Sequence, residues 1–268
     1  MSRELLTNDR AKNAEIAQLF IEQGYVVVKN AFSAEQIKQL SGLVTAFHQA
    51  WLTNNQDFYQ IKAVNSAYLT SIQYLNQSQR LALLQFIGCH TLMKNVRAVL
   101  GDTACFMNSQ LFFNPLNPKQ KNYWHRDPQY HLTLEQQKQA LCGPQVIHFR
   151  VPLVDEIGLE LVPGSHKRWD NPQQLNVRLE QNGAHNYDDL TDGKIIPLNV
   201  GDILIFSANI LHRGLYSAER LAFDVLFCEP DVELLDFVKA DCLPQQADLH
   251  LIEDAGAYQN TMAFTSQC

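Results

Sequence analysis

The chain has 268 residues and a formal net charge of -7, and 46% of its residues are hydrophobic and 18% charged, which is typical of a globular protein with an ample core. It contains no dense run of Lys and Arg, so nucleic-acid binding is not expected, because neutralising phosphates requires clustered cations. The six cysteines include no C-x-x-C pair, which argues against a disulfide framework or a zinc ribbon. Since the sequence also shows neither a signal-peptide pattern nor an apolar run of about 18 residues, we expect a cytoplasmic protein without a membrane partner.

The first hundred residues predict helices around one short strand. Residues 14–23 predict a helix that ends at Gly24, and residues 25–28 form an apolar run that predicts a buried strand. Ser33 begins a capping-box pattern, after which apolar residues recur at helical spacing and predict one buried helix face: Ile37, Leu40, Val44, Phe47 and Trp51. A further helix is expected over residues 81–100, with Gly101 just past its end.

From about residue 103, short β-like runs alternate with turn residues, a pattern typical of a sandwich or barrel. The expected strands cover residues 104–113, 146–153, 159–162, 194–198, 203–206 and 221–227. Gly201 and Asp202 form a turn that leads into one of these strands. We therefore predict a mainly β fold with flanking helices. Residues 167–192 form a long polar insertion, which is expected to be a lid, a substrate loop or disordered.

Residues 123–128 read Tyr-Trp-His-Arg-Asp-Pro and contain the tripeptide H-x-D. On a strand, residues i and i+2 point to the same face, so His125 and Asp127 can reach one metal ion, and Pro128 is expected to end the strand. Two imidazoles and one carboxylate on one face of Fe(II) leave three positions open, as oxygen activation requires. By itself the tripeptide is weak, because a chain of this composition contains about 0.5 copies by chance, and a surface turn with a capping Asp is the alternative.

A third metal ligand is expected from a later segment. His212 follows the predicted buried strand at 203–206 and lies beside a turn. The sequence therefore predicts a metal site formed by three residues, His125, Asp127 and His212, which are called the triad from here on.

Arg220 precedes the apolar run that starts at Leu221, and strand alternation points its side chain inward with Ala222. A buried arginine is costly unless it meets an anion, and a guanidinium can bind a carboxylate through two hydrogen bonds. The far carboxylate of 2-oxoglutarate is one candidate, and an internal salt bridge to Asp224 or Glu219 is the other. Arg213 is the nearest rival, but as the direct neighbour of a predicted metal ligand it should point to the opposite face.

At this point the sequence resembles the phytanoyl-CoA dioxygenase-like Fe(II)/2-oxoglutarate oxygenases, from about residue 15 to residue 227. The stretches that carry the resemblance are Gly-Tyr-Val-Val-Val at 24–28, Trp-His-Arg-Asp at 124–127, Val-Pro-Gly-Ser-His-Lys at 162–167, and Gly-Asp-Ile-Leu-Ile-Phe at 201–206 followed by His212. The co-substrate arginine of the family falls on Arg220.

The resemblance implies a double-stranded β-helix, that is, a jelly-roll barrel related to the cupins. It implies one oxygenase domain over residues 1–268, with a helical part at about 1–100, the barrel at about 103–230 and a C-terminal extension at 231–268. It also implies Fe(II), 2-oxoglutarate and O₂ as cofactor and co-substrates, with a small molecule hydroxylated and succinate and CO₂ released. Related halogenases have a small residue in place of the metal-binding carboxylate, so the presence of Asp127 favours hydroxylation.

Other polar residues have weaker patterns. Asn108 and Gln110 share one face of a predicted strand and are candidates for binding 2-oxoglutarate or substrate, although they fit equally well as satisfied strand amides. His148 is expected to be a core or surface histidine, since the triad already fills the needs of the metal. His166 is interpreted as a loop anchor.

The sequence leaves two other functions open. A cupin-type metal-dependent isomerase or epimerase uses the same kind of barrel without 2-oxoglutarate, and Arg220 argues against it. A non-catalytic metal-binding module is the second alternative, and the intact triad argues against it.

Overall fold

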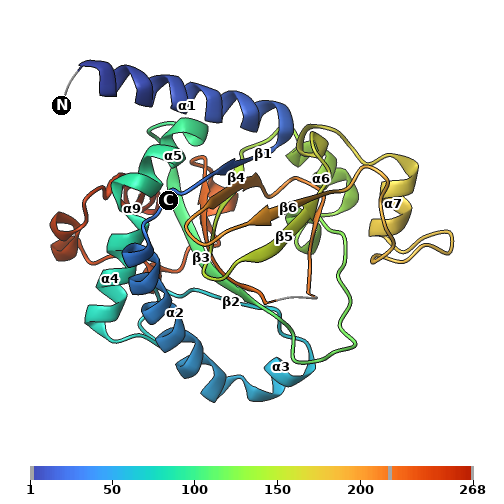
Figure 1. The fold of residues 1–268 in the computed structure, drawn as a ribbon, viewed down its shortest axis with the longest axis horizontal. Helices are drawn as coiled ribbons and strands as arrows, with labels where there is room; N and C mark the ends of the chain where they lie inside the picture. The colour runs from blue at the N-terminus through green and yellow to red at the C-terminus, as the bar shows by residue number, and fades with distance from the viewer. Residues whose placement is uncertain (1–2, 217–218, 267–268) are drawn as a thin grey trace.

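Two antiparallel sheets form the centre of the computed structural model, which describes residues 3–216 and 219–266 (Figure 1). The six-stranded sheet has the order β1-β7-β4-β9-β3-β2, and the three-stranded sheet has the order β6-β5-β8. The strands are β1 Tyr25–Val28, β2 Asn65–Ala67, β3 Cys105–Phe113, β4 Val146–Pro152, β5 Glu156–Leu161, β6 Lys194–Leu198, β7 Ile203–Ser207, β8 His212–Gly214 and β9 Leu221–Cys228.

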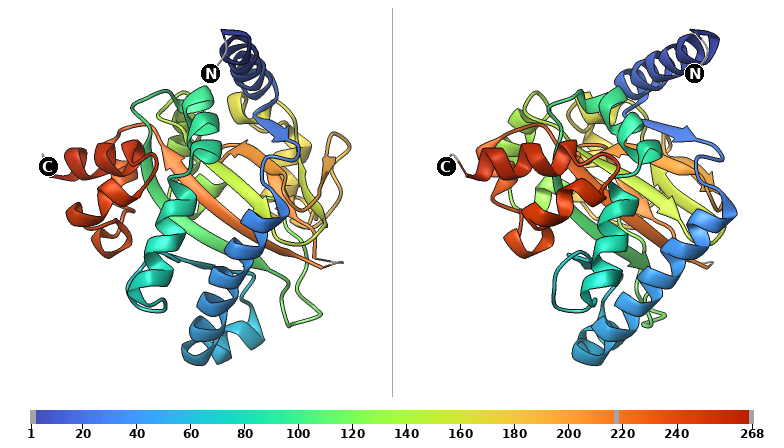
Figure 2. Two further views of the ribbon diagram at one scale, coloured as in Figure 1. Left: turned by 60° about the vertical axis from the view of Figure 1, so that its left-hand side comes forward. Right: turned by 90° about the vertical axis from the view of Figure 1, so that its left-hand side faces the viewer.

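Helices precede, interrupt and follow these strands. The α-helices are α1 Arg3–Gln23, α2 Ala34–Asn54, α3 Gln56–Ile61, α4 Gln77–Ile87, α5 His90–Leu100, α6 Leu134–Ala140, α7 Pro172–Arg178, α8 Val232–Leu235 and α9 Gly256–Thr265. Short 3₁₀ helices are η1 Asp127–Tyr130, η2 Ser165–Lys167, η3 Ala240–Cys242 and η4 Gln246–Leu251. Helices α2, α4, α5 and α9 lie on one side of the large sheet, and the small sheet and α7 lie on the other (Figures 1 and 2).

The alternation of side chains along each strand produces an apolar core on each face of the large sheet. Along β7, Ile203 and Ile205 pack with the helices in the larger core. Leu204 and Phe206 point the other way and pack against residues of β5 and β6, such as Leu161. The space between the two sheets is therefore lined by strand residues, and a polar side chain that points inward is removed from water.

The helix predicted before Gly24, the strand after it and the capped helix that follows are all present, and the first of these helices begins earlier than predicted, at Arg3. Gly24 follows α1 with a φ of 78°, a conformation that glycine adopts without steric cost. Ser33 caps α2 with a complete capping box, and the five residues predicted for its buried face are all buried. Asp202, in the predicted turn before β7, accepts hydrogen bonds from the backbone N–H groups of Asn30 and Asn199.

The single helix predicted over residues 81–100 is wrong, because the structure has two helices that are separated at Gly88. A Cβ atom at Gly88 would lie 2.2 Å from Cγ2 of Ile252, so the glycine permits the C-terminal segment to approach the backbone closely. Cys89 has an extended conformation before α5 begins at His90. The apolar pattern continues across this break, which explains why it was not predicted.

The predicted fold class is confirmed in part. The strands are antiparallel and flanked by helices, but the chain is a mixture of helix and sheet, and within the described residues the two sheets do not join into a closed barrel. Strand β1, which was predicted, and β2, which was not, form the two edges of the large sheet. In the C-terminal extension, the Thr261 side chain of α9 donates a hydrogen bond to the Phe106 carbonyl of β3, at 2.9 Å.

Candidate metal centre

Two histidines lie directly opposite each other on neighbouring backbone segments. His125 forms an antiparallel bridge with His212, the first residue of β8, through two N–H···O bonds of 2.9 and 3.0 Å. Residues that are directly opposite in an antiparallel pair project to the same face, and the centroids of the two imidazole rings are 4.2 Å apart. The backbone pairing thus brings together two of the three predicted metal ligands.

Both imidazoles are oriented in the same way by the backbone. Nδ1 of His125 lies 3.1 Å from the carbonyl of Tyr123, and Nδ1 of His212 lies 3.0 Å from the carbonyl of Ile210. A carbonyl can only accept, so these contacts assign the proton of each neutral ring to Nδ1. The lone pair of each Nε2 is then free to bind a metal ion.

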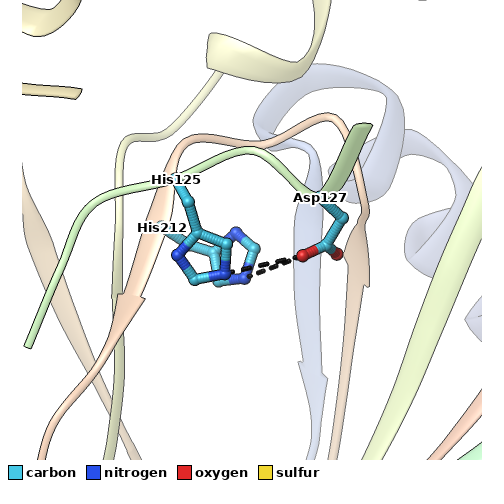
Figure 3. A group of neighbouring side chains, drawn as sticks. All are labelled: His125, Asp127 and His212. Atoms are coloured by element: carbon cyan, nitrogen blue, oxygen red, sulfur yellow. Dashed lines mark ion pairs between the residues drawn. The ribbon is translucent and has the colours of Figure 1, made fainter. Parts of the chain in front are cut away.

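The carboxylate of Asp127 completes the group (Figure 3). Its Oδ1 lies 3.5 Å from Nε2 of His125 and 3.9 Å from Nε2 of His212. The prediction that His125 and Asp127 share one strand is wrong, because Asp127 is the first residue of η1, and its backbone N–H donates to the Ala208 carbonyl at 3.1 Å. The 3₁₀ turn brings the carboxylate to the same side of the chain as the imidazole.

These three residues can hold a metal ion, because one ligand atom from each lies within 4.8 Å of the other two. Burial and the neighbouring imidazole of His125 lower the pKa of His212 to about 3, so this ring is neutral at physiological pH. Burial by itself would raise the pKa of Asp127, but His212 and hydrogen bonds with His125 and His148 hold it well below its usual range. Two neutral nitrogens and one carboxylate oxygen form the donor set typical of non-haem Fe(II) sites.

Arg220 lies on the inner side of the sheets, as its alternation with Ala222 predicted, and it is buried. Its guanidinium lies over the rings of Phe112 and Tyr216, with its central carbon 5.3 and 5.1 Å from the two ring centroids. Burial, with a smaller effect of Arg150, lowers the pKa of Arg220 to about 10, so the group remains charged at neutral pH. Its Nε and Nη1 atoms have no hydrogen-bond partner among the described residues. A buried cation with two free donors can bind an anion.

Gly214 places this guanidinium close to the triad. A Cβ atom at Gly214 would lie 2.7 Å from Nη2 of Arg220, so the guanidinium packs directly against the glycine backbone. Gly214 and His212 are two residues apart on β8 and therefore face the same side, about 7 Å from each other along the strand. The Arg220 guanidinium therefore lies against the face of β8 that carries His212, one of the three candidate metal ligands.

Arg213, the rival considered from the sequence, and Arg150 have partners of their own. The Arg213 guanidinium pairs with Glu160 and Asp189 at 2.6 Å each, on the side of β8 away from His212. The Arg150 guanidinium pairs with Glu156 at 2.8 Å and with Asp224 at 3.2 Å.

Asp224 therefore does not serve as the salt-bridge partner that the sequence left open for Arg220. Its carboxylate is held by Arg150 and lies 3.4 Å from His148. Of the three arginines, Arg220 has two donors without a partner among the described residues, Nε and Nη1, whereas Arg150 has one, its Nε, and is held by Glu156 and Asp224.

Asn108 and Gln110 lie on β3, where their partners on β9 are Leu226 and Asp224. Since Asp224 faces the inner side, both amides do so as well. Asn108 is buried, and its Oδ1 accepts from the backbone N–H of Ser109 at 2.7 Å. The structure brings both residues to the inner face, and a role in binding 2-oxoglutarate stays a prediction.

The sequence did not predict the contact between His148 and the candidate metal ligand Asp127. His148 is buried on β4, as expected for a core histidine, but its Nε2 lies 2.8 Å from Oδ2 of Asp127. Alternation along β4 could have placed His148 and Arg150 on one face. The contact with Asp127 depends on how distant segments pair, which no local pattern indicates.

The Pro-Gly-Ser-His stretch connects the two segments that carry the ligands. The Ser165 hydroxyl accepts a hydrogen bond from the backbone N–H of Leu211 at 2.8 Å, next to His212. The Ser165 carbonyl accepts from Nη1 of Arg126, also at 2.8 Å, between His125 and Asp127. Through these two bonds Ser165 anchors the loop to both ligand segments.

The same loop carries a buried carboxylate between two arginines. Oδ1 of Asp170 accepts from Arg126 at 2.7 Å, and Oδ2 lies 2.6 Å from Nη2 of Arg178. All three side chains are at most 1% exposed. The 167–192 insertion is thus ordered where it meets the metal motif, and it contains α7.

We expect Asp170→Asn to lower the free energy of unfolding by about 3–5 kcal/mol, because it leaves two buried guanidinium groups without a counter-charge. Chemical denaturation measures this change. Asp192→Asn is the matched control in the same insertion, since the Asp192 pair with Arg168 is solvent-exposed and its loss should cost less than about 1 kcal/mol. Equal losses in the two variants would contradict a structural role for the buried pairs.

Aromatic residues near the motif serve packing. Trp124 is completely buried, its indole N–H donates to the Asp188 carbonyl at 3.0 Å, and the Arg213 guanidinium lies over its ring. In the insertion, the rings of His185 and Tyr187 stack with centroids 4.9 Å apart.

Among the described residues, no helix combines the length and apolar character needed to cross a membrane.

Comparison with solved structures supports the fold. The chain is similar to EctD from S. alaskensis with 2-oxoglutarate and 5-hydroxyectoine, at 17% identity and a TM-score of 0.57 over 81% of this chain and 76% of that one. It is similar to AviO1 from Streptomyces viridochromogenes Tue57, at 17% identity and a TM-score of 0.55 over 82% and 96% of the two chains. The epimerase SnoN in complex with Fe³⁺, alpha-ketoglutarate and nogalamycin RO has 15% identity and a TM-score of 0.51 over 82% and 85%.

In sequence, no curated protein matches the chain. The family model for phytanoyl-CoA dioxygenase (PhyH) matches residues 20–216, which is well over half of the chain. The matched range contains all three triad residues and ends before Arg220. The chain therefore belongs to the phytanoyl-CoA dioxygenase (PhyH) family.

Proposed function

We propose that the chain is a non-haem Fe(II)- and 2-oxoglutarate-dependent dioxygenase that hydroxylates a small molecule and releases succinate and CO₂. Iron and 2-oxoglutarate are the cofactors of this family. The observation that carries the proposal is the buried Arg220, whose Nε and Nη1 have no partner among the described residues and whose guanidinium lies against the face of β8 that carries His212. The proposal includes one oxygenase domain over residues 1–268, with its two sheets arranged as a double-stranded β-helix.

The triad fits the metal that the family uses. His125 and His212 would hold iron through Nε2, because both Nδ1 atoms contact backbone carbonyls, and Asp127 would hold it through Oδ1. Three protein ligands leave coordination positions for a chelating co-substrate and for O₂. When bound, iron and 2-oxoglutarate supply the oxidising power that the side chains of the chain lack.

The protein contributes orientation and a dry environment. The free Nε and Nη1 of Arg220 would donate hydrogen bonds to the far carboxylate of 2-oxoglutarate, so that its other end lies toward His212, two residues along β8 from Gly214. The ring faces of Phe112 and Tyr216 hold the guanidinium plane in place. Burial of the arginine keeps water from competing for these donors. Asn108 and Gln110 are proposed as further contacts from β3.

A second candidate is an epimerase with the same cofactors, because the structure of SnoN, an epimerase, is among those similar to the chain. An epimerase inverts a carbon centre, whereas a hydroxylase adds one oxygen atom from O₂ to its product. Mass spectrometry of the product formed under ¹⁸O₂ separates them. A cupin-type isomerase would show no dependence on 2-oxoglutarate, and a non-catalytic module would form no succinate.

The experiment that tests the proposal is anaerobic reconstitution with Fe(II), followed by 2-oxoglutarate while the visible spectrum is recorded. We expect a weak charge-transfer band of the chelate in the wild type and its loss in His212→Ala, which removes one imidazole ligand. His185→Ala is the control, because this histidine is exposed in the insertion and its loss should leave the band unchanged. Iron binding without the band in the wild type would contradict the proposed co-substrate.

A further inference from the structure

A buried histidine lies between the metal-binding carboxylate and a second carboxylate. Nε2 of His148 is 2.8 Å from Oδ2 of Asp127, and its Nδ1 is 3.4 Å from Oδ2 of Asp224. The His148 side chain is 5% exposed and that of Asp224 is 1% exposed. The imidazole therefore donates a hydrogen bond to Asp127 and lies beside the buried carboxylate of Asp224.

The contact with His148 separates the roles of the two oxygens of Asp127. Oδ1 faces the imidazoles of His125 and His212, whereas Oδ2 accepts from His148. A carboxylate with one oxygen occupied in this way presents a single oxygen to a metal ion. If Oδ2 were free, the carboxylate could rotate and bind through both oxygens, and this would fill one of the positions left open for the other ligands.

Charges of alternating sign continue beyond His148. Asp224 is 3.2 Å from Nη1 of Arg150, and Nη2 of Arg150 is 2.8 Å from Glu156. The side chains of all three are 1% exposed. Because a buried charge is costly without a partner, each member of this row holds its neighbours in place. The row ends on Oδ2 of Asp127.

The sheet also fixes the position of the His148 ring. On β4, His148 pairs with Phe206 of β7 and with Leu226 of β9. The rings of His148 and Phe206 are stacked, with centroids 4.5 Å apart and planes inclined by 15°. The imidazole is thus held on both sides by strands and has little freedom to turn away from Asp127.

We propose that His148 is a positioning residue that holds Asp127 so that only Oδ1 binds the metal ion. It acts through Asp127 and has no contact with the metal of its own. The inference rests on the proposed function, because it takes the triad to be the metal site. Hydrogen-bonding partners of metal ligands typically contribute about 10–100-fold to metal affinity.

The test compares His148→Phe with His148→Gln. Phenylalanine keeps the ring that stacks on Phe206 but removes the donor to Asp127, whereas the glutamine amide restores a donor near the position of Nε2. Co(II) alone is the probe, since its visible spectrum reports the number and geometry of its ligands. We expect the Phe variant to bind Co(II) about 10–100-fold more weakly, with a changed spectrum, and the Gln variant to restore most of the affinity.

His166→Phe is the matched control. His166 is also a buried histidine, 3% exposed, but it packs against Phe20 and contacts no carboxylate. Its replacement changes the packing to a similar degree and should leave the affinity and the spectrum of Co(II) unchanged. Melting temperatures of the metal-free variants show the purely structural effect. If the Phe variant does not fold, His148→Asn replaces it, because its shorter amide does not reach Asp127.

Unchanged Co(II) affinity and spectrum in His148→Phe would overturn the inference, and so would equal effects in His148→Phe and His166→Phe. Failure of the proposed function has a different signature. In that case the wild type itself shows no chelate band with Fe(II) and 2-oxoglutarate. If the wild type shows the band and the Phe variant binds Co(II) normally, only the inference about His148 is wrong, and the proposed function stands.

Discussion

Replacing Asp127 with alanine is expected to weaken Fe(II) binding and to abolish turnover, while the fold stays intact. The variant loses the one anionic ligand of the triad, so the metal affinity should fall by more than the ~10–100-fold that loss of an outer hydrogen-bonding partner costs. The backbone bond from residue 127 to the Ala208 carbonyl does not depend on the side chain. Metal titration and the formation of succinate from 2-oxoglutarate measure the two effects.

Loss of Asp127 also leaves the buried His148 without one of its two acidic neighbours, so a small loss of stability is expected, about 1–3 kcal/mol. Asp102→Ala controls for loss of a carboxylate as such, because the side chain of Asp102 is 92% exposed. This control should bind Fe(II) and form succinate as the wild type does. Normal succinate formation in Asp127→Ala would show that the triad assignment is wrong.

Local patterns were sufficient to predict the parts of the fold that depend on neighbouring residues. The capping box at Ser33 and the helical spacing from Ile37 to Trp51 correspond to α2 and its buried face. Alternation along β9 pointed Arg220 inward, and alternation on β8 pointed Arg213 outward. In each case the decisive interaction lies within a few residues of the chain, so the sequence contains it.

Features that depend on distant segments could not be predicted. The break at Gly88 follows from packing against Ile252, and the sequence between the two helices keeps its apolar pattern. The 3₁₀ turn at Asp127 depends on a backbone bond to Ala208. The link between His148 and Asp127 requires both the register of β4 and the approach of a loop that belongs to no sheet.

The candidate site shows the same division. The sequence identified His125, Asp127 and His212 as chemical groups of the right kind, and the structure brings their ligand atoms together. The sequence could not show whether the Arg220 guanidinium has a salt-bridge partner. Asp224 pairs with Arg150 and not with Arg220, because the register between β4 and β9 places Arg150 directly opposite Asp224.

Replacing Arg220 with alanine should raise the concentration of 2-oxoglutarate that the enzyme requires, with a smaller effect on iron binding. Removing one member of a buried charge pair costs about 2–5 kcal/mol, which corresponds to about a 30-fold to a few thousand-fold change in affinity. Arg220→Lys keeps the charge but loses the two-pronged geometry of the guanidinium, so an intermediate effect is expected. Titration of the chelate band with 2-oxoglutarate measures all three proteins under the same conditions.

Arg213→Ala is the matched control for this prediction, because it removes an equally large cation from the same region. Its guanidinium is bound by Glu160, Asp189 and the Tyr187 carbonyl on the far side of β8. The control should lose stability but keep the affinity for 2-oxoglutarate. If Arg220→Ala required the same concentration of 2-oxoglutarate as the wild type, another cation would bind the far carboxylate. Arg150 would then be the first to test, since it lies over the same Phe112 ring as Arg220, although it would have to exchange its bonds with Glu156 or Asp224 for the ligand.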